Sequence, residues 1–211
     1  MRQALSFPKN RDEVSPLIRR FAHRQIAWCY CLGQSLRGQN WKTHSAAHLD
    51  DEEVEAAGQQ SNPSVALLQM HAETIRELAE RGELTDFQRL SMDELLTKLT
   101  DSMGKAERIR NTVFPRTYRV FLKAFIYVFI TILSISLSEV EGYWEIVVTT
   151  VISIPFFLLE STSKHMQDPF SNRPTDCAVT AIARTIEINI LQLLGEEDVP
   201  DPYPGADFYM M

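Results

Sequence analysis

The chain has 211 residues, of which 45% are hydrophobic and 23% charged, a size that accommodates one or two domains. Its formal net charge is −7, and no Lys or Arg follows Arg184. An acidic chain without a basic stripe binds nucleic acid poorly, so no nucleic-acid partner is expected. Cys29, Cys31 and Cys177 form no even disulfide framework, which predicts free thiols in a reducing compartment.

The first predicted helix spans residues 12–38. Ser15 and Pro16 supply an N-cap and a first-turn proline, and Gly38 suits the end of the helix. Apolar residues at helical spacing predict its packing face, and its arginines are expected on the surface. The apolar residues are Leu17, Phe21, Ile26, Cys29, Leu32 and Leu36, and the arginines are Arg19, Arg20, Arg24 and Arg37.

Further helices are predicted at 50–57, 63–81 and 84–109. Asn62 and Pro63 start the second of these, and Gly82 ends it. Its expected packing residues are Val65, Leu68, Ile75 and Leu78. The last helix has apolar residues at Phe87, Leu90, Leu95, Leu96, Leu99 and Met103.

Two apolar segments follow, at 121–138 and 146–159. The first contains Lys123 as its one charged residue, and the second contains none. The first is at the lower limit of a membrane span, and Tyr143 and Trp144 extend the second as interface anchors. These features predict a transmembrane hairpin. The alternative is a pair of buried core helices in a soluble bundle.

Charge asymmetry predicts how the hairpin is oriented. The basic residues at its entry are Lys105, Arg108, Arg110, Arg116 and Arg119, and the acidic residues around its turn are Glu139, Glu141 and Glu145. The positive-inside rule then places most of the chain in the cytoplasm and the turn outside. The expected division is a cytoplasmic helical region at 1–116, a transmembrane hairpin at 117–160, and a C-terminal cytoplasmic helix with an acidic, Pro-rich tail at 161–211.

The C-terminal region predicts a helix at 178–194 followed by an extended arm. The expected packing face consists of Ile182, Ile186, Ile190, Leu193 and Leu194. Within this helix, Glu187 can pair with Arg184, and an exposed pair of this kind contributes only about a few tenths of a kcal/mol. The three prolines of 198–211 predict an arm that wraps a neighbour or stays disordered.

No sequence motif indicates an enzyme, a catalytic residue or a cofactor. The chain has no Gly-rich phosphate loop and no Gly-x-Ser-x-Gly. His44 and His48 have the spacing of a helical metal site, but two histidines are a weak signal, and a solvated helix face is the favoured interpretation.

The order of these segments resembles the end of a bestrophin-family channel, in particular the shorter, bacterial-type members. Asp168-Pro169-Phe170 and the helix at 178–194 resemble the C-terminal signature, and 107–115 resembles the segment that leads back to the membrane. The helices at 12–38, 63–81 and 84–109 resemble the cytoplasmic helices of the family, and 117–159 resembles its third and fourth membrane helices.

The resemblance implies an all-α fold, with a helical cytoplasmic bundle and a transmembrane hairpin. It also implies a multi-pass cell-membrane protein, a pentamer with its pore on the fivefold axis, that passes chloride or other anions through the lipid bilayer. Because the family's first two membrane helices have no counterpart here, the expectation is an N-terminally truncated subunit without the hydrophobic neck. A non-conducting membrane-attached assembly or regulatory protein, and a soluble metal-binding enzyme, are the alternatives.

Two local departures from the family affect the signature. Ser171 replaces its usual glycine, and Lys164-His165 stand where an acidic pair is expected. In the calcium-binding run of animal members only Asp168 and Asp176 match, and Arg173 occupies a ligand position. A hard cation needs six or more oxygen ligands, so no calcium regulation and no metal are expected.

The resemblance also assigns a candidate pore residue. The family has a second, cytoplasmic constriction, formed by one apolar side chain per subunit at the start of the helix before the return to the membrane. Counting back from Phe114-Pro115 places Phe87 there. The alternative is that Phe87 is a core residue that faces Leu90 and Leu95.

Overall fold

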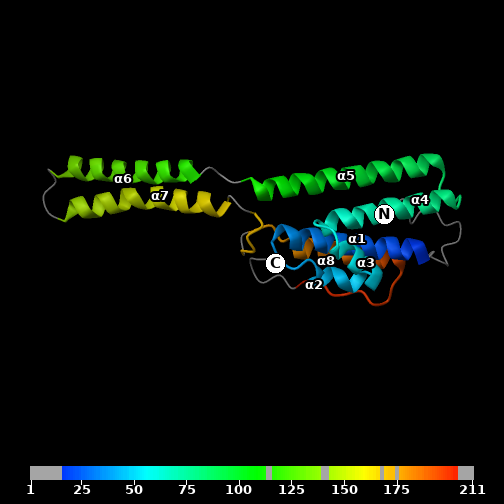
Figure 1. Ribbon diagram of the computed structural model, residues 1–211. Helices are drawn as coiled ribbons and strands as arrows, with labels where there is room; N and C mark the ends of the chain where they lie inside the picture. Colours follow the sequence, from blue (N-terminus) through cyan, green and yellow to red (C-terminus); the bar gives the residue numbers. More distant parts are fainter. Residues whose placement is uncertain (1–15, 113–115, 139–142, 167–168, 174–175, 204–211) are drawn as a thin grey trace. The chain divides into compact units, whose positions relative to one another are not determined.

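The computed structural model describes residues 16–112, 116–138, 143–166, 169–173 and 176–203 (Figure 1). Every regular element within these ranges is a helix, which confirms the predicted all-α fold. The helices are α1 (Pro16–Leu36), α2 (Lys42–Ser45), the 3₁₀ turn η2 (Ala46–His48), α3 (Asp51–Gly58), α4 (Pro63–Glu80), α5 (Asp86–Asn111), α6 (Arg116–Leu137), α7 (Trp144–Met166) and α8 (Val179–Leu194).

The chain divides into two compact units. The bundle unit comprises Met1–Arg108 and Phe170–Met211, and the hairpin unit comprises Ile109–Pro169. Segments far apart in the sequence therefore meet in the bundle unit, where α8 packs directly on α1.

Local capping explains where α4 begins and ends. The Asn62 side chain accepts a hydrogen bond from the Ser64 amide at 3.1 Å, with Pro63 in the first turn. Gly82 adopts a φ of 73°, and the Glu83 amide donates to the Leu78 carbonyl at 3.0 Å. This left-handed ending is a conformation that glycine adopts without steric cost. The predicted start and stop of this helix are confirmed.

Helix α1 is the centre of the bundle unit, since it contacts α2, α4 and α8. Ala22, Ile26, Ala27 and Cys31 have no exposed surface. A helix covered on several sides is buried around most of its circumference, not along one stripe. The predicted face therefore covers only part of the buried surface, and Leu17, Cys29 and Leu32 are only half-buried.

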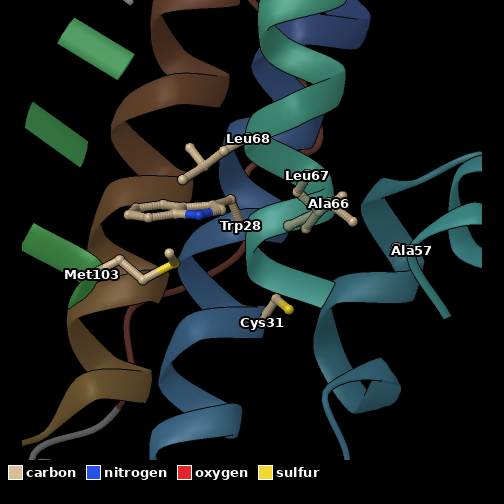
Figure 2. Packing of buried hydrophobic residues seen from close by; sticks show 8 residues of the cluster. Trp28, Cys31, Ala57, Ala66, Leu67, Leu68 and Met103 are labelled. Carbon is tan, nitrogen blue, oxygen red and sulfur yellow. The ribbon is translucent and has the colours of Figure 1, made fainter. Parts of the chain in front are cut away.

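Trp28 organises the main apolar cluster. Its ring lies between Leu68 of α4 and Met103 of α5 (Figure 2). Leu67 of α4 is fully buried nearby, whereas Val65 is 46% exposed. Val65 was predicted to pack with Leu68, and that prediction is wrong because the buried side of α4 includes Leu67 and Leu68 but not Val65.

Helix α5 contributes little to this core. Its buried residues are Met92 and Met103. Phe87, Leu90 and Leu95 are exposed, so the apolar residues of α5 are divided between a contact with the bundle and an uncovered surface.

In the hairpin unit, α6 and α7 run side by side in opposite directions (Figure 1). Lys123 pairs with Glu160 at 3.6 Å, and Ser134 donates to Glu145 at 3.0 Å. Tyr127 packs against Phe157 and Phe129 against Phe156, with ring centroids 5.9 and 5.0 Å apart. Polar contacts thus lie toward the ends of the pair, and aromatic contacts lie between them.

The apolar surface of the hairpin is uncovered. Thr117–Leu137 and Trp144–Ser163 are long and apolar enough to cross a membrane, and only 6% and 0% of the residues in the apolar 18-residue window of each are buried. The core helices of a soluble protein would be mostly buried. The alternative of two buried core helices is therefore wrong.

Candidate pore residue, signature segment and buried polar cluster

Phe87 lies in the first turn of α5, which a reciprocal cap holds in place. The Thr85 hydroxyl accepts from the Gln88 amide at 3.3 Å, and the Gln88 side chain accepts from the Thr85 amide at 2.8 Å. This is a capping box, which fixes the direction of the first helical turn. Phe87 is 81% exposed, so the alternative that it is a core residue facing Leu90 and Leu95 is wrong.

The signature segment is partly described. Asp168 lies outside the described residues, whereas Pro169 and Phe170 form a turn in which Phe170 is half-buried. The Asp176 carboxylate accepts from the Arg173 amide at 2.8 Å, and the Asp176 amide donates to the Arg173 carbonyl at 3.0 Å. Asp176 therefore closes a backbone turn.

Arg37 fastens the end of the signature segment to the end of α1. Its guanidinium donates to the Cys177 carbonyl at 3.1 Å and to the Thr180 hydroxyl at 3.0 Å. Where Val179 approaches α1, a Cβ added at Gly33 would lie 3.4 Å from the valine side chain. These contacts fix the start of α8 against α1.

A second set of contacts holds the middle of α8. Glu187 is only 4% exposed, and its carboxylate accepts from the Tyr30 hydroxyl at 2.6 Å and from Arg184 at 3.0 Å. His48 Nε2 lies 3.2 Å from the other carboxylate oxygen. We call Tyr30, His48, Arg184 and Glu187 the Glu187 cluster. The predicted pairing of Glu187 with Arg184 is confirmed, but the carboxylate is buried and not exposed, because three partners compensate for its burial.

The buried position of Glu187 also changes which face of α8 packs. Ala183, Ile190, Leu191 and Leu194 are buried against α1. Ile182 and Leu193, predicted to lie on this face, are 50% and 57% exposed. The apolar spacing alone did not show this, because the packed face includes a charged residue.

Burial shifts the pKa of two members of the Glu187 cluster. Burial and the hydrogen bond to Glu187 raise the pKa of Tyr30, so its hydroxyl remains a donor. Burial lowers the pKa of His48, and the charges of His23 and Arg184 add to this effect, while Glu187 and Glu196 oppose it. The arrangement favours a neutral His48 beside the Glu187 carboxylate.

The segment after α8 packs against α1 and α8 of the same chain. Glu196 pairs with His23 at 3.0 Å and with Arg19 at 3.5 Å, and Val199 packs against the α1–α8 cluster. The Tyr203 ring lies 4.8 Å from the Arg184 guanidinium. The described part of the predicted arm, up to Tyr203, thus covers α8, and residues 204–211 lie outside the described residues.

Arg24 was expected on the surface, and this is wrong. It is 4% exposed and donates through Nε to Glu53 at 2.9 Å. It also donates to the Met70 carbonyl at 2.7 Å and to the Thr74 hydroxyl at 2.8 Å. Because these bonds satisfy the guanidinium, α1, α3 and α4 can meet over a charged side chain.

His44 and His48 do not share a helix face. His44 lies in α2, which ends at Ser45, and is exposed; His48 lies in η2 and bonds Glu187. Among the described residues, no group of three or more His, Cys, Asp or Glu side chains is arranged to hold a metal ion. The favoured interpretation, a solvated face, is correct for His44 but wrong for His48.

A helical bundle with an uncovered apolar hairpin is an arrangement that suits a helical membrane protein. The family model for bacterial and fungal bestrophin proteins matches residues 1–192. The chain therefore belongs to the bacterial/fungal bestrophin family, which confirms the resemblance.

Individual relatives give the same result. The voltage-dependent anion channel-forming protein YneE of Escherichia coli is 28% identical over 186 residues, which cover 88% of this chain and 61% of that protein. A voltage-dependent anion channel-forming protein of Ralstonia nicotianae is 26% identical, with 99% and 68% covered. The chain thus spans 61% of the length of the Escherichia coli relative.

Solved structures agree in fold. A single-residue variant of the bacterial bestrophin homologue from Klebsiella pneumoniae superimposes with a TM-score of 0.84 at 28% identity, covering 92% of this chain and 72% of that chain. A second structure of the same homologue gives a TM-score of 0.79, with 85% and 66% covered. The likeness includes both the bundle and the hairpin, since it covers most of the chain.

Sequence reasoning missed three of the buried polar residues, Arg24, Glu53 and Tyr30. The side chains that pair with them, Glu53 with Arg24 and Glu187 with Tyr30, lie 29 or more residues away, so no local spacing connects these pairs. The nearest signal was Glu187 itself, a carboxylate at the centre of an apolar helix.

Proposed function

We propose that the chain is a subunit of a bestrophin-type anion channel that passes chloride passively across the cell membrane, and that it acts as a channel and not as an enzyme. The observation that carries this proposal is the family match over residues 1–192, together with relatives whose names describe anion channels. The apolar hairpin with its uncovered surface supports it, because such a surface suits a lipid environment.

The proposed arrangement in the membrane follows the charges. Residues 117–160 form the transmembrane hairpin, while the helical region 1–116 and the C-terminal region 161–211 face the cytoplasm. Basic residues before α6 and acidic residues around the hairpin turn support this orientation.

A homo-pentamer is proposed as the assembly, with α8 and the arm after it in contact with neighbouring subunits. Ile182 and Leu193 support a contact of this kind, because they are apolar and half or more exposed on α8. Of the signature residues Asp168, Pro169, Phe170 and Asp176, Asp176 is proposed to fix the turn that precedes α8, since its carboxylate accepts from the Arg173 amide.

Phe87 is the proposed cytoplasmic aperture. Five apolar rings around an axis form a narrow, poorly hydrated constriction, which can gate by dewetting. The 81% exposure of Phe87 supports this role, because a capped helix start presents the ring to solvent and not to the core.

The test is Phe87→Ala in a chain joined to two preceding membrane helices from a relative, recorded in planar bilayers. We expect altered conductance or anion preference with an unchanged melting temperature, because the exposed ring contributes little to packing. Leu90→Ala is the matched control, since Leu90 lies on the same helix and is 61% exposed. Unaltered permeation in the Phe87→Ala channel would rule out the aperture.

A non-conducting, membrane-attached assembly is the second candidate. The chain spans 61% of the Escherichia coli relative, so the activity of that whole relative is a proposal for this chain. Recording from the purified 211-residue chain distinguishes the two candidates. Anion currents from this chain alone would exclude the non-conducting assembly.

A further inference from the structure

His48 occupies an enclosed position between two other rings. Its ring is stacked on Tyr30 with centroids 6.0 Å apart and an interplanar angle of 2°. On the other side, His23 lies 6.0 Å away at 29°. Through Nε2, His48 reaches Glu187 of α8 at 3.2 Å, so one side chain connects the 3₁₀ turn η2 with both α1 and α8.

The charges around His48 are already balanced. Glu187 faces it from α8 beside Arg184 at 3.0 Å, and Glu196 faces His23 at 3.0 Å and Arg19 at 3.5 Å. Two carboxylates thus oppose two guanidinium groups while the histidines are neutral. Arg20, Asp50 and Glu53 line the same cavity as His48, and their charges are also paired: Arg20 lies 3.2 Å from Asp50 and 2.9 Å from Glu53, and Arg24 donates to Glu53 at 2.9 Å. Tyr30 and His44, whose rings lie 5.5 Å apart, supply no negative charge at neutral pH.

A proton on His48 would therefore add an uncompensated positive charge. The side chain is only 15% exposed, so water screens this charge poorly. Arg184 on α8 and, when protonated, His23 on α1 would repel it. His48 can take up the proton at low cost only by moving out of the stack into solvent.

We propose that residues 41–50 form an acid-released clasp, in which neutral His48 holds η2 on α8 and proton uptake by His48 detaches it. Release removes one partner of the buried Glu187 carboxylate, which also accepts from Tyr30 on α1. The clasp thereby couples proton concentration to the contact between α1 and α8.

The pH window follows from the direction of the shift. Burial lowers the pKa of docked His48 below the ordinary value of 6.5, which the released side chain regains. The released form therefore binds more protons in mild acid, and the docked state is favoured less as pH falls. The clasp is fully closed above 6.5 and opens progressively below it.

Hydrogen–deuterium exchange of the full chain in detergent micelles at pH 7.5 and 5.5 tests the clasp. After correction for intrinsic exchange, peptides covering 41–50 should exchange up to about tenfold faster at the lower pH, because one pH unit changes a one-proton equilibrium by at most that factor. Peptides of α5, which contains no histidine, serve as the internal reference.

His48→Gln should abolish this acceleration, because the amide can reach Glu187 without titrating. His44→Gln is the matched control and should keep it, since His44 is exposed and makes no bond to Glu187. If His48→Gln fails to fold, His48→Asn replaces it. Acid acceleration that persists in the His48 variant, or equal exchange of 41–50 at both pH values in the unmodified chain, would overturn the proposal.

Discussion

At the scale of single residues, the bundle unit buries two kinds of charged or polar side chain. The first kind has hydrogen-bond partners for its polar atoms, and the second kind has none among the described residues. Arg24 and Glu187 belong to the first kind. Each makes at least three polar contacts, and such networks specify how helices pack because other arrangements would leave a charge unpaired. Loss of one partner is therefore costly even where the net contribution of the pair is small.

His71 belongs to the second kind. It has no exposed surface, it packs against Phe21 with ring centroids 4.2 Å apart, and neither ring nitrogen has a hydrogen-bond partner among the described residues. Burial, reinforced by the charge of Arg24, lowers the pKa of His71 from 6.5 to about 3. The folded bundle therefore holds His71 neutral in mild acid.

We expect acid to destabilise the bundle unit through His71. The unfolded chain takes up a proton below pH 6.5 and the folded chain does not, so the free energy of unfolding falls as pH decreases from 6.5 toward 3. His71→Leu removes this loss, which is about 3 kcal/mol at pH 4 and at most ~5 kcal/mol once the pH is below 3. Urea unfolding at pH 7 and pH 4 measures it. An equal loss of stability in the variant and the unmodified chain would show that other groups carry the acid sensitivity.

At the scale of the helices, capping residues and breaks in the sequence decide where a helix begins and ends, whereas tertiary contacts decide which face of it packs against its neighbours. The proline, glycine and capping residues place the ends of α4 and the start of α5 close to the predicted positions. The packed face of α8 was not predictable in the same way. Ile182 and Leu193 have the spacing of core residues but are exposed, because Glu187 takes the central place on the face that meets α1.

Two glycines should respond in opposite directions to the same substitution. Gly195 has a φ of 72° directly after α8, and the Glu196 amide bonds the Leu191 carbonyl at 3.1 Å. Gly195→Ala should cost about 1 kcal/mol, because alanine is strained in this conformation. Gly104 lies inside α5 with open space around it, so Gly104→Ala should stabilise the helix by about 0.5–1 kcal/mol.

Thermal melting by circular dichroism measures both changes in the same buffer. The two variants serve as controls for each other, since each adds one methyl group. A stabilising Gly195→Ala would show that the helix ends in another conformation in solution.

At the scale of the whole molecule, the hairpin unit and the bundle unit differ in what covers them. The bundle buries its apolar residues internally, whereas the two long helices of the hairpin leave theirs open. The proposed membrane topology accounts for this difference, because lipid can cover the hairpin.

Cysteine labelling tests that topology in intact cells. With a membrane-impermeant thiol reagent, Gly142→Cys at the hairpin turn should react, and Ser161→Cys near the end of α7 should not. Cys177 is exposed in the bundle unit and serves as the internal control for the cytoplasmic side. Labelling of Ser161→Cys and not Gly142→Cys would reverse the proposed orientation.

The sequence by itself determined the helices, the apolar hairpin and the family. These features depend on periodicity, caps and breaks within about one helix length, so neighbouring residues contain the necessary information. The tertiary structure alone decided which polar residues are buried. Glu187 meets Tyr30 across 157 positions and Arg24 meets Glu53 across 29, and a charge is buried only where such distant partners satisfy it. For the same reason the exposure of Phe87 and Leu193 depended on which helices surround them, and not on their own spacing.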